Sequence, residues 1–457
     1  MAEGCFGALD KPAVGSGLMI RSPHPSESPG APSSHSGSLG RTRWWIVWTV
    51  FVSTVINYIN RQTFSVLSPV ISTQFHFSHA DLAKVIGAFQ LSYALTWLAG
   101  GIFLDAVGTR VGLAVAVVWW SLVNMAMGFA NSLSAFIGFR FMLGIGEGLN
   151  WPGGSKTVAE WFPRQERSLA VAIFDSGSSI GGALAALVIP LVALAFGWRW
   201  SFVASGLLGF AWLVVWLHVY HPLERHPRVT SEEATYIRAG QEAPRTSGEK
   251  RPRRWLLLVR ERNVWGIVLG RSLTDPIWWF YVFWLPQYLS DVRGFNLKQI
   301  AMFAWLPFVA ADLGNFSGGF VSGLCIRKGM STLRARIVVC IVSCLPVLAG
   351  IPAARTHNAF VALALICVAL WGYASWSTMG LTLPSDLFPQ DVVATVTGLS
   401  GFTAGLAGVA FTYVVGITVD RFSYGPAFWV AALMPLGATA SLLLLVRTPE
   451  HAGVYPR

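Results

Sequence analysis

Charged residues are scarce in this chain. Of its 457 residues only 12% are Asp, Glu, Lys or Arg, about half the share that is typical of soluble globular proteins. Hydrophobic residues make up 54%. A surface this poor in charge excludes an ordinary soluble enzyme and an intrinsically disordered protein, and it leaves an integral helical membrane protein.

The chain also lacks a cysteine framework. Cys340 and Cys344 are one helical turn apart in an apolar run, which is typical of small core residues. No CxxC or His/Cys spacing suggests a metal, and no phosphate-cradling GxxxxGK[ST] run occurs. We therefore expect no enzyme activity, no metal and no cofactor. The net charge of +11 is dispersed among loops, so we also expect no nucleic-acid partner.

Apolar runs recur from Trp44 onward, each close to the roughly 20 residues that cross a bilayer as a helix. Residues 1–43 are rich in Pro, Ser and Gly, which predicts a disordered cytoplasmic tail and not a signal peptide. The runs are too long and too uniformly apolar for barrel strands, so helices must satisfy their backbone groups in lipid. We expect twelve spans, at about 44–71, 80–104, 112–131, 133–159, 168–196, 199–220, 263–290, 299–324, 333–354, 358–386, 391–420 and 425–447.

Positive charge predicts the topology. With a cytoplasmic N-terminus, the cytoplasmic segments hold 23 Lys and Arg and the outside loops hold 6. This bias predicts a multi-pass protein of the inner (plasma) membrane with both termini in the cytoplasm. The hydrophilic stretch 221–262 then separates a six-helix bundle at 44–220 from a second at 263–447, and 448–457 forms a cytoplasmic tail.

Two landmarks repeat between these halves. Gly100-Gly101 and Gly318-Gly319 are 218 residues apart, and the similar triplets WFP at 161–163 and LFP at 387–389 are 226 apart. Parallel repeats of this kind place a substrate at the midplane between the halves, as in major facilitator transporters. The predicted fold class is therefore an all-α membrane protein with twelve transmembrane helices in two pseudo-symmetric six-helix bundles.

The run GGIFLDAVGTR at 100–110 resembles the signature loop of the major facilitator superfamily, roughly G-x3-D-R-x-G-R. Gly101, Asp105, Gly108 and Arg110 match, whereas Ala106 stands where the family usually has arginine. The resemblance implies a conformational latch in which glycines permit close helix approach and Asp105 caps a helix or pairs with a cation. A mere tight turn is the alternative.

Ionisable residues inside the predicted spans are costly and usually functional. The candidates singled out are Arg61 in the first span, Arg140 and Glu147 in the fourth, and Arg271 and Asp275 in the seventh. A guanidinium offers a planar fork to a carboxylate and stays charged, which indicates a site for an organic anion. The alternative is that Arg140 with Glu147, and Arg271 with Asp275, neutralise each other only to hold helices together.

Glu147 is the best candidate for a proton carrier. A carboxyl group in a cavity of low dielectric can exchange a proton, and anion binding to a neighbouring arginine changes that balance. Asp275 is a second candidate for proton coupling. Alternatively, Glu147 is a permanently ionised partner of Arg140.

Polar and aromatic side chains complete the candidate substrate site. Hydroxyl groups, amides and aromatic faces suit a polyol, although each one taken singly is more typical of helix packing. The candidates are Asn57, Asn60, Tyr93, Ser178, Trp279, Ser375 and Thr403.

Longer stretches resemble the anion:cation symporter family, and particularly its hexuronate (glucuronate and galacturonate) transporters. The matching runs are INYINRQT, GEGLNWPGG, EWFPRQERSLAVAIFDSGSSIGG, HPRVTSEEATYIRAGQEA and GFNLKQIAMFAWLPFVAADLGN, which cover most of residues 44–420. The resemblance implies proton-driven uptake of a sugar acid, with roles for Arg61, Arg140, Glu147 and Tyr93. Some relatives that transport galactonate-type acids have an aspartate where this chain has Asn60, so a second titrating carboxylate is missing there. The expected partners are a small organic anion, protons and the lipid bilayer, and we expect a monomer.

Other functions stay open at this point. Another organic anion, such as an aldonate, an aldarate or an aromatic acid, would suit the same arginines. A proton-driven efflux antiporter is disfavoured because the fifth span lacks the GP step of a G-x3-GPxxGG run. A non-transporting membrane sensor is disfavoured because the tail and the linker are short for a signalling domain.

Overall fold

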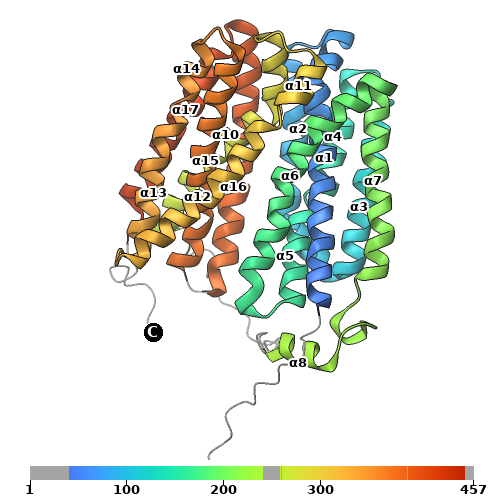
Figure 1. Cartoon of the computed structure of the whole chain (residues 1–457), viewed down its shortest axis with the longest axis vertical. Coiled ribbons are helices and arrows are strands. Elements are labelled where there is room, and N and C mark those ends of the chain that lie inside the picture. Colours follow the sequence, from blue (N-terminus) through green and yellow to red (C-terminus); the bar gives the residue numbers. More distant parts are fainter. Residues whose placement is uncertain (1–40, 240–257, 259, 389, 448–457) are drawn as a thin grey trace, which may run out of the picture. The chain divides into compact units, whose positions relative to one another are not determined.

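Helices account for the regular structure of this chain (Figure 1). The computed structural model describes residues 41–239, 258, 260–388 and 390–447, and these contain no β-strand. The predicted N-terminal tail, much of the predicted linker and the C-terminal tail lie outside the described residues. The helices all belong to one compact unit, residues 40–457.

The N-terminal half, as we use the term, contains the helices before the linker. They are α1 (Thr42–Phe75), α2 (His79–Val107), α3 (Thr109–Met127), α4 (Leu133–Glu147), α5 (Asn150–Trp161), α6 (Arg164–Phe196) and α7 (Trp198–Val219). The linker contributes a 3-10 turn η1 (Leu223–Arg225) and α8 (Ser231–Ala239).

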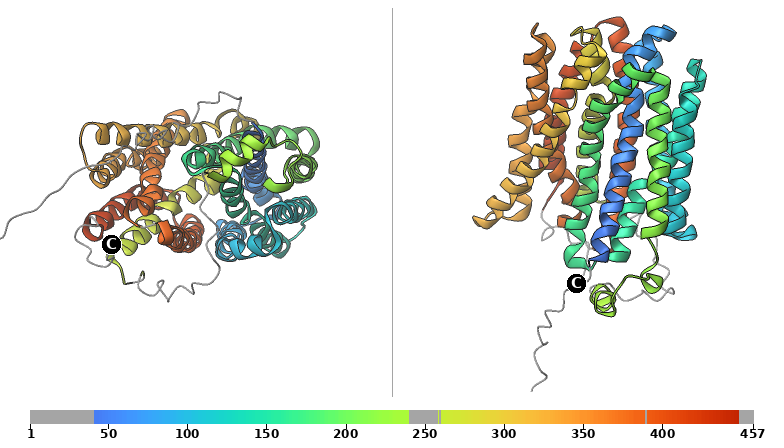
Figure 2. Two further views of the ribbon diagram at one scale, coloured as in Figure 1. Left: turned by 90° about the horizontal axis from the view of Figure 1, so that it is seen from below. Right: turned by 45° about the vertical axis from the view of Figure 1, so that its right-hand side comes forward.

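The C-terminal half contains the helices after the linker, and Figure 2 shows them beside those of the N-terminal half. They are α10 (Arg262–Asp291), α11 (Leu297–Phe303), α12 (Leu306–Arg327), α13 (Thr332–Val347), α14 (Gly350–Arg355), α15 (Ala359–Leu387), α16 (Gln390–Arg421) and α17 (Gly425–Leu445).

Three predicted spans are each divided into two helices. The run 133–159 forms α4 and α5, which are interrupted at Gly148 and Leu149. A Cβ atom on Gly148 would lie 2.7 Å from Cβ of Thr96 in α2, so α4 ends where it approaches α2 closely. The runs 299–324 and 333–354 are divided in the same way, into α11 with α12 and α13 with α14.

The repeated triplets end corresponding helices. Helix α5 ends at Trp161 and α15 ends at Leu387, and in both cases the next residue is a phenylalanine in extended conformation. The φ angle is −121° at Phe162 and at Phe388. A proline follows each phenylalanine in the sequence, and the residue before proline disfavours the helical region. Similar local chemistry thus ends a helix in each half.

Eight helical segments of the described chain are long and apolar enough to cross a membrane, and the two segments of α2 taken as one span make nine. The remaining long elements are α1, α10, and α4 followed by α5. These three carry the buried residues Arg61, Arg140, Glu147 and Arg271, and charged side chains lower the hydropathy of a helix. These three elements and the nine segments together are compatible with the twelve predicted spans, which stay a prediction.

Large apolar side chains cover the outside of both halves. Phe129, Phe196, Phe316 and Leu444 are each more than 70% exposed. In a bilayer such side chains contact lipid tails, so their exposure fits a membrane protein.

Contacts between the halves involve α2 with α16, α1 with α10, and α6 with α11 and α12. Small residues let α2 and α16 approach closely. A Cβ atom on Gly416 would lie 2.5 Å from Cβ of Ala83, and one on Gly405 would lie 2.9 Å from Cβ of Ala94. Such small-residue interfaces are common between membrane helices.

The linker helix α8 is attached to the N-terminal half by a buried ion pair. Arg43 of α1 contacts Glu233 of α8 at 3.2 Å and Glu166 of α6 at 2.8 Å. The Glu233 side chain is fully buried. The linker therefore has an ordered part with a defined place, which its hydrophilic composition alone did not predict.

Candidate functional site

Arg61 of α1 and Glu147 of α4 form a fully buried ion pair. The distance from Arg61 Nε to Glu147 Oε2 is 3.0 Å, and both side chains have no exposed surface. Arg61 Nη2 also donates to Asn57 Oδ1, one helical turn earlier, at 3.0 Å. Three residues that the sequence singled out are thus in direct contact.

Arg140 of α4 contacts the same turn of α1. Its Nη1 atom donates to the backbone carbonyl of Arg61 at 3.2 Å. The ion-pair partner of Glu147 is Arg61 and not Arg140, which corrects the pairing within α4 that the sequence suggested. Two helical turns separate Arg140 from Glu147, about 10 Å along the axis, so the neighbouring helix supplies the closer cation.

Aromatic rings surround the Arg61 guanidinium. Its Cζ atom lies 4.4 Å from the ring centre of Tyr58, 4.5 Å from Tyr93, 5.2 Å from Phe89 and 5.7 Å from Trp279. Ring faces attract cations, and the attraction is larger where water is excluded. Trp279 belongs to α10, so the C-terminal half supplies part of the enclosure.

Arg140 has a similar environment. Its Cζ atom lies 4.5 Å from the ring centre of Phe89, 5.2 Å from Phe64 and 5.5 Å from Phe283. Phe283 is also on α10, where its ring stacks on Trp279 at 5.4 Å. The two arginines therefore lie where the N-terminal half meets α10.

Several charged atoms of this group have no hydrogen-bond partner among the described residues. They are Nη1 of Arg61, Nε and Nη2 of Arg140, and Oε1 of Glu147. An unpaired buried donor, and above all a charged one, is costly. Three arginine N–H positions are therefore left to bind an acceptor such as a carboxylate.

Arg271 and Asp275 form a second pair within α10. Arg271 Nη2 lies 2.8 Å from Asp275 Oδ2, and its Nη1 donates to Ser400 of α16 at 3.2 Å. Arg271 is eight residues from Trp279 on one helix, which corresponds to about 12 Å along the axis. The structure thus places this pair further along α10, and the polar contacts described for it do not reach Arg61.

Trp97 of α2 is close to residues of both arginine sites. The Tyr93 ring centre lies 6.2 Å from that of Trp97. A Cβ atom on Gly401 would lie 3.0 Å from the Trp97 ring and 3.6 Å from Arg271 Nη1. Trp97 therefore lies near both Tyr93 and Arg271.

Other predicted substrate residues are placed elsewhere. Asn60 accepts from Asn124 of α3 at 3.1 Å and thus faces the interior of the N-terminal half. Ser375 donates to the Gly314 carbonyl at 2.8 Å in the packing of α15 against α12, and Thr403 donates to its own helix. Ser178 is half-buried on α6.

Tyr58, Phe64 and Phe89 are contact residues that the sequence analysis missed. Tyr58 is three residues before Arg61 in α1, so helical spacing was a usable signal for this contact. Phe64 contacts Arg140 of α4, which spacing within α1 could not reveal. Phe89 is four residues before Tyr93 in α2, and the two rings stack at 5.6 Å. Their contacts with arginine depend on how the helices pack.

The predicted latch loop makes its described polar contacts within the N-terminal half and with His221 at the start of the linker. Asp105 pairs with Lys156 of α5 at 2.6 Å, and Arg110 Nη2 donates to the Leu217 carbonyl at 2.6 Å. Gly108 has a φ angle of +85°, which strongly favours glycine. A Cβ atom on Gly101 would meet no described atom within 4 Å, so close helix approach does not explain that glycine.

Metal-ligating side chains do not gather in the described part of the chain. No group of three or more His, Cys, Asp or Glu residues there has the geometry to hold a metal ion.

Known proteins match most of this chain in sequence. The family model of the Major Facilitator Superfamily matches residues 50–412. The hexuronate transporter of Escherichia coli (strain K12) is 34% identical over 89% of this chain and 95% of the relative. A galacturonate transporter of Dickeya chrysanthemi is 37% identical over 61% of this chain and 81% of the relative. The D-galactonate transporter of Escherichia coli O6:H1 is 30% identical over 89% of this chain and 96% of the relative.

Solved structures share the fold. A D-xylose–proton symporter superposes with a TM-score of 0.68 at 15% identity, over 89% of this chain and 98% of the other. A bacterial homologue of the human lysosomal transporter Spinster, in an inward-facing conformation, superposes with a TM-score of 0.67 at 17% identity, over 89% and 96%. These findings confirm the expected all-α major facilitator fold and the resemblance to sugar-acid transporters. The chain belongs to the Major Facilitator Superfamily.

Proposed function

We propose that this protein is a symporter that imports a sugar acid together with protons by alternating access. A hexuronate such as glucuronate or galacturonate is the proposed substrate. The supporting observation is the buried group of Arg61, Arg140 and Glu147, which has unpaired donors and is enclosed by aromatic side chains of both halves. The sugar-acid transporters named above, at 30–37% identity, support the substrate class.

The substrate carboxylate binds between the two arginines. Arg61 Nη1 and the Nε and Nη2 atoms of Arg140 are the donors without described partners. Charge-assisted hydrogen bonds from guanidinium groups suit a carboxylate in number and in direction. Tyr93 and Trp279, which both face Arg61, offer a hydroxyl group, an indole N–H and ring faces for the sugar.

Charge balance couples the anion to a proton. Two arginines and one glutamate carry one net positive charge when all three are ionised. A bound anion alone would cancel that charge, whereas an anion bound together with a proton on Glu147 leaves it unchanged. Glu147 leaves Arg61 when the substrate arrives, and an unpaired carboxylate in a dry site takes up a proton.

Alternating access follows from the position of α10. Trp279 and Phe283 cover the arginines from the C-terminal half, so rocking of that half relative to the N-terminal half uncovers or encloses the site. A ligand that contacts both halves binds the enclosed state best, which is the requirement for ligand-driven closure.

Proteoliposomes that contain the purified protein test this proposal. An inward proton gradient should drive accumulation of labelled glucuronate above its external concentration, and a protonophore should abolish the accumulation. Uptake that does not depend on the gradient would refute the proton coupling. Competition by galacturonate, but not by an aldarate or an aromatic acid, would support hexuronates as the substrate class. Stronger competition by an aldarate or an aromatic acid would make that acid the substrate class instead.

A further inference from the structure

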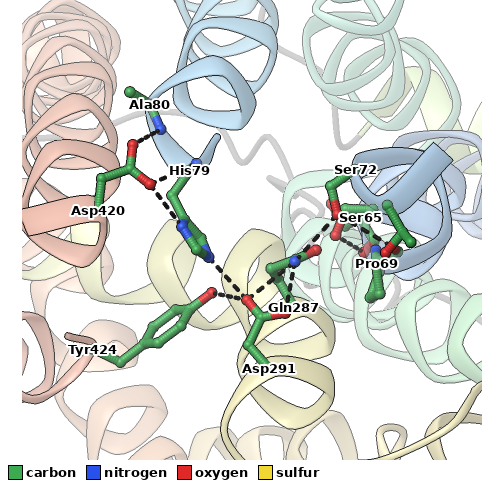
Figure 3. Close-up of polar contacts among 11 residues, drawn as sticks. Ser65, Pro69, Ser72, His79, Ala80, Gln287, Asp291, Asp420 and Tyr424 are labelled. Carbon is green, nitrogen blue, oxygen red and sulfur yellow. Dashed lines mark hydrogen bonds and ion pairs between the residues drawn. The ribbon is translucent and has the colours of Figure 1, made fainter. Parts of the chain in front are cut away.

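A polar cluster joins the two halves at the end of the helices opposite α8 (Figures 1 and 3). His79, the first residue of α2, lies between Asp291 at the end of α10 and Asp420 near the end of α16. We call these three residues, with Tyr424 and Gln287, the His79 cluster. The side chains of His79, Asp291 and Asp420 are 27–30% exposed, so water reaches them.

Both ring nitrogens of His79 face a carboxylate. The distance from Nδ1 to Asp420 Oδ1 is 2.8 Å, and the distance from Nε2 to Asp291 Oδ2 is 2.9 Å. A carboxylate only accepts hydrogen bonds, and a neutral imidazole has a single N–H group. Both contacts are therefore hydrogen bonds only when the imidazole carries two protons and a positive charge.

Asp420 also binds the start of α2. Its Oδ1 atom accepts from the backbone N–H of His79 at 2.9 Å, and its Oδ2 atom accepts from that of Ala80 at 2.8 Å. The N-terminal end of a helix has unpaired N–H groups and a partial positive charge, which a carboxylate stabilises. A side chain of the C-terminal half thus completes a helix of the N-terminal half.

Asp291 extends the cluster to α1 and to the start of α17. Its Oδ2 atom accepts from the Tyr424 hydroxyl at 3.1 Å, and its Oδ1 atom accepts from Gln287 Nε2 at 3.0 Å. The same Gln287 nitrogen lies 3.4 Å from Ser72 Oγ of α1. The His79 ring itself lies against Trp284 of α10 and the edge of Tyr424.

We propose that the His79 cluster is a gate that holds the two halves together at this end of the protein, and that the gate weakens when His79 loses a proton. Its charged contacts come from α10 and α16, and its neutral contacts come from Trp284, Tyr424 and, through Gln287, Ser72. The role in a transport cycle rests on the alternating access proposed above. With both termini in the cytoplasm, this end is the outer face, so external pH would act on opening toward the outside.

A neighbouring ion pair serves as a matched control. Lys84 and Asp81 are 2.8 Å apart on the same helix, close to His79 in sequence. Both residues belong to α2, so this pair does not join the two halves. Removing it changes charge near the gate without breaking a bond between the halves.

Access of a thiol reagent to Ser65, which shares a face of α1 with Arg61 and Ser72 by its spacing of four and seven residues, tests the proposal. Ser65 is buried, its hydroxyl has no partner among the described residues, and it is two turns (about 10 Å) along α1 from Ser72. In a variant whose five cysteines are replaced by alanine, Ser65→Cys is labelled by a membrane-impermeant maleimide added to intact cells. His357→Cys, in the exposed loop between α14 and α15, gives the intrinsic pH dependence of the reaction.

His79→Gln should raise the normalised labelling rate about tenfold or more, because it removes a charge-assisted hydrogen bond between the halves. With His79 intact the rate should rise between about pH 6 and about pH 9, as the imidazole loses a proton. His79→Arg keeps the charge and should stay slow throughout this range. Asp420→Asn should repeat the effect of His79→Gln from the other half, and Lys84→Ala should leave the rate unchanged.

Equal labelling of His79→Gln, Asp420→Asn and the parent would overturn the gate, and so would a rise of the same size in Lys84→Ala. Labelling needs no substrate, so it separates this proposal from the proposed function. A protein that labels as expected but does not accumulate glucuronate keeps the gate and loses the function. Normal glucuronate uptake together with a labelling rate that does not depend on His79 or on pH would keep the proposed function and overturn the gate.

Discussion

Nε of Arg61 lies 3.0 Å from Oε2 of Glu147, and this contact joins α1 to α4 with both side chains fully buried. Breaking a buried pair by removing one partner is costly, because the other charge is left without compensation. A bound carboxylate offers Arg61 a replacement partner, and a proton offers one to Glu147. The pair can therefore separate only when both ligands arrive, which leads to the first prediction.

Glu147→Gln should uncouple the two ligands. Glutamine has the shape of the acid but does not exchange a proton, so proton-driven accumulation of glucuronate should fall to the level of equilibration. Counterflow exchange of glucuronate should be affected less. Measuring both in the same proteoliposomes checks this, and equal loss of both would instead support a purely structural salt bridge.

Arg61→Ala and Arg140→Ala should each reduce uptake by about a hundredfold or more, because each removes a charge that is buried at the site. The protein should still be present in the membrane at a normal level. Arg61→Lys keeps the charge but loses the planar fork, so it should restore little of the activity. Initial rates of labelled glucuronate uptake, normalised to protein in the membrane, measure these effects.

Arg355→Ala is the control for these arginine variants. Arg355 is exposed at the end of α14 and packs on Trp429, far along the chain from the site. Its removal should leave uptake unchanged. Normal uptake by Arg61→Ala or Arg140→Ala would remove that arginine from the site.

Gly144→Ala should destabilise the N-terminal half. A Cβ atom at Gly144 would collide with Ser92 Oγ and lie 2.5 Å from the Phe89 carbonyl oxygen of α2. Overpacking of this kind costs about 1–3 kcal/mol, and the gain of about 1 kcal/mol in helix propensity does not offset it. A lower apparent melting temperature of the purified protein is the expected result.

Gly138→Ala is the matched control on the same helix. A Cβ atom there would meet no described atom within 4 Å. Only the propensity gain applies, so the melting temperature should stay the same or rise. An equal decrease in both variants would contradict the proposed close packing of α4 on α2.

His226 should make the attachment of the linker sensitive to acid. Its Nε2 lies 3.0 Å from the Val219 carbonyl and its Nδ1 accepts from the Arg228 backbone N–H, an arrangement that suits the neutral ring. Burial lowers the pKa of His226 below its usual range. As the pH falls, His226 therefore takes up a proton more readily in the unfolded linker than in the attached one. The contribution of His226 to the stability of the attached linker is complete above about pH 6.5 and is lost as the pH falls below that value.

Limited trypsin cleavage at Arg225 and Arg228 measures this effect. Cleavage of the wild type relative to His226→Gln should increase as the pH is lowered from about 8 to about 5, because glutamine can donate and accept without titrating. A ratio that does not change with pH would show that His226 does not control the linker.

The sequence predicted the fold class and part of the site for a clear physical reason. Arginine and glutamate inside apolar spans are costly, so Arg61, Arg140 and Glu147 stood out, and the structure brings all three together. Tyr93 and Trp279 were also identified, and both face Arg61.

The rest could not be predicted because it depends on helix rotation and packing. Asn60 is adjacent to Arg61 in the chain, yet one step along a helix turns its side chain by about 100°, so it faces Asn124 instead. The partner of Glu147 lies on another helix, which spacing within α4 could not reveal. The close approach of Gly148 to Thr96, where α4 ends, is again a contact between helices.

The ring faces around Arg61 have a consequence for how firmly cargo is held. A transporter has to release its substrate in every cycle. An arginine without competing contacts would release a bound anion too slowly. The rings of Tyr58, Tyr93 and Trp279 stabilise the Arg61 guanidinium by cation–π contacts when no substrate is bound. A bound anion therefore replaces weak contacts, and these contacts form again when the anion leaves. Fast release and tight binding therefore compete at Arg61, and replacing the Tyr58 ring, which is not assigned to the sugar, should yield tighter binding and slower turnover.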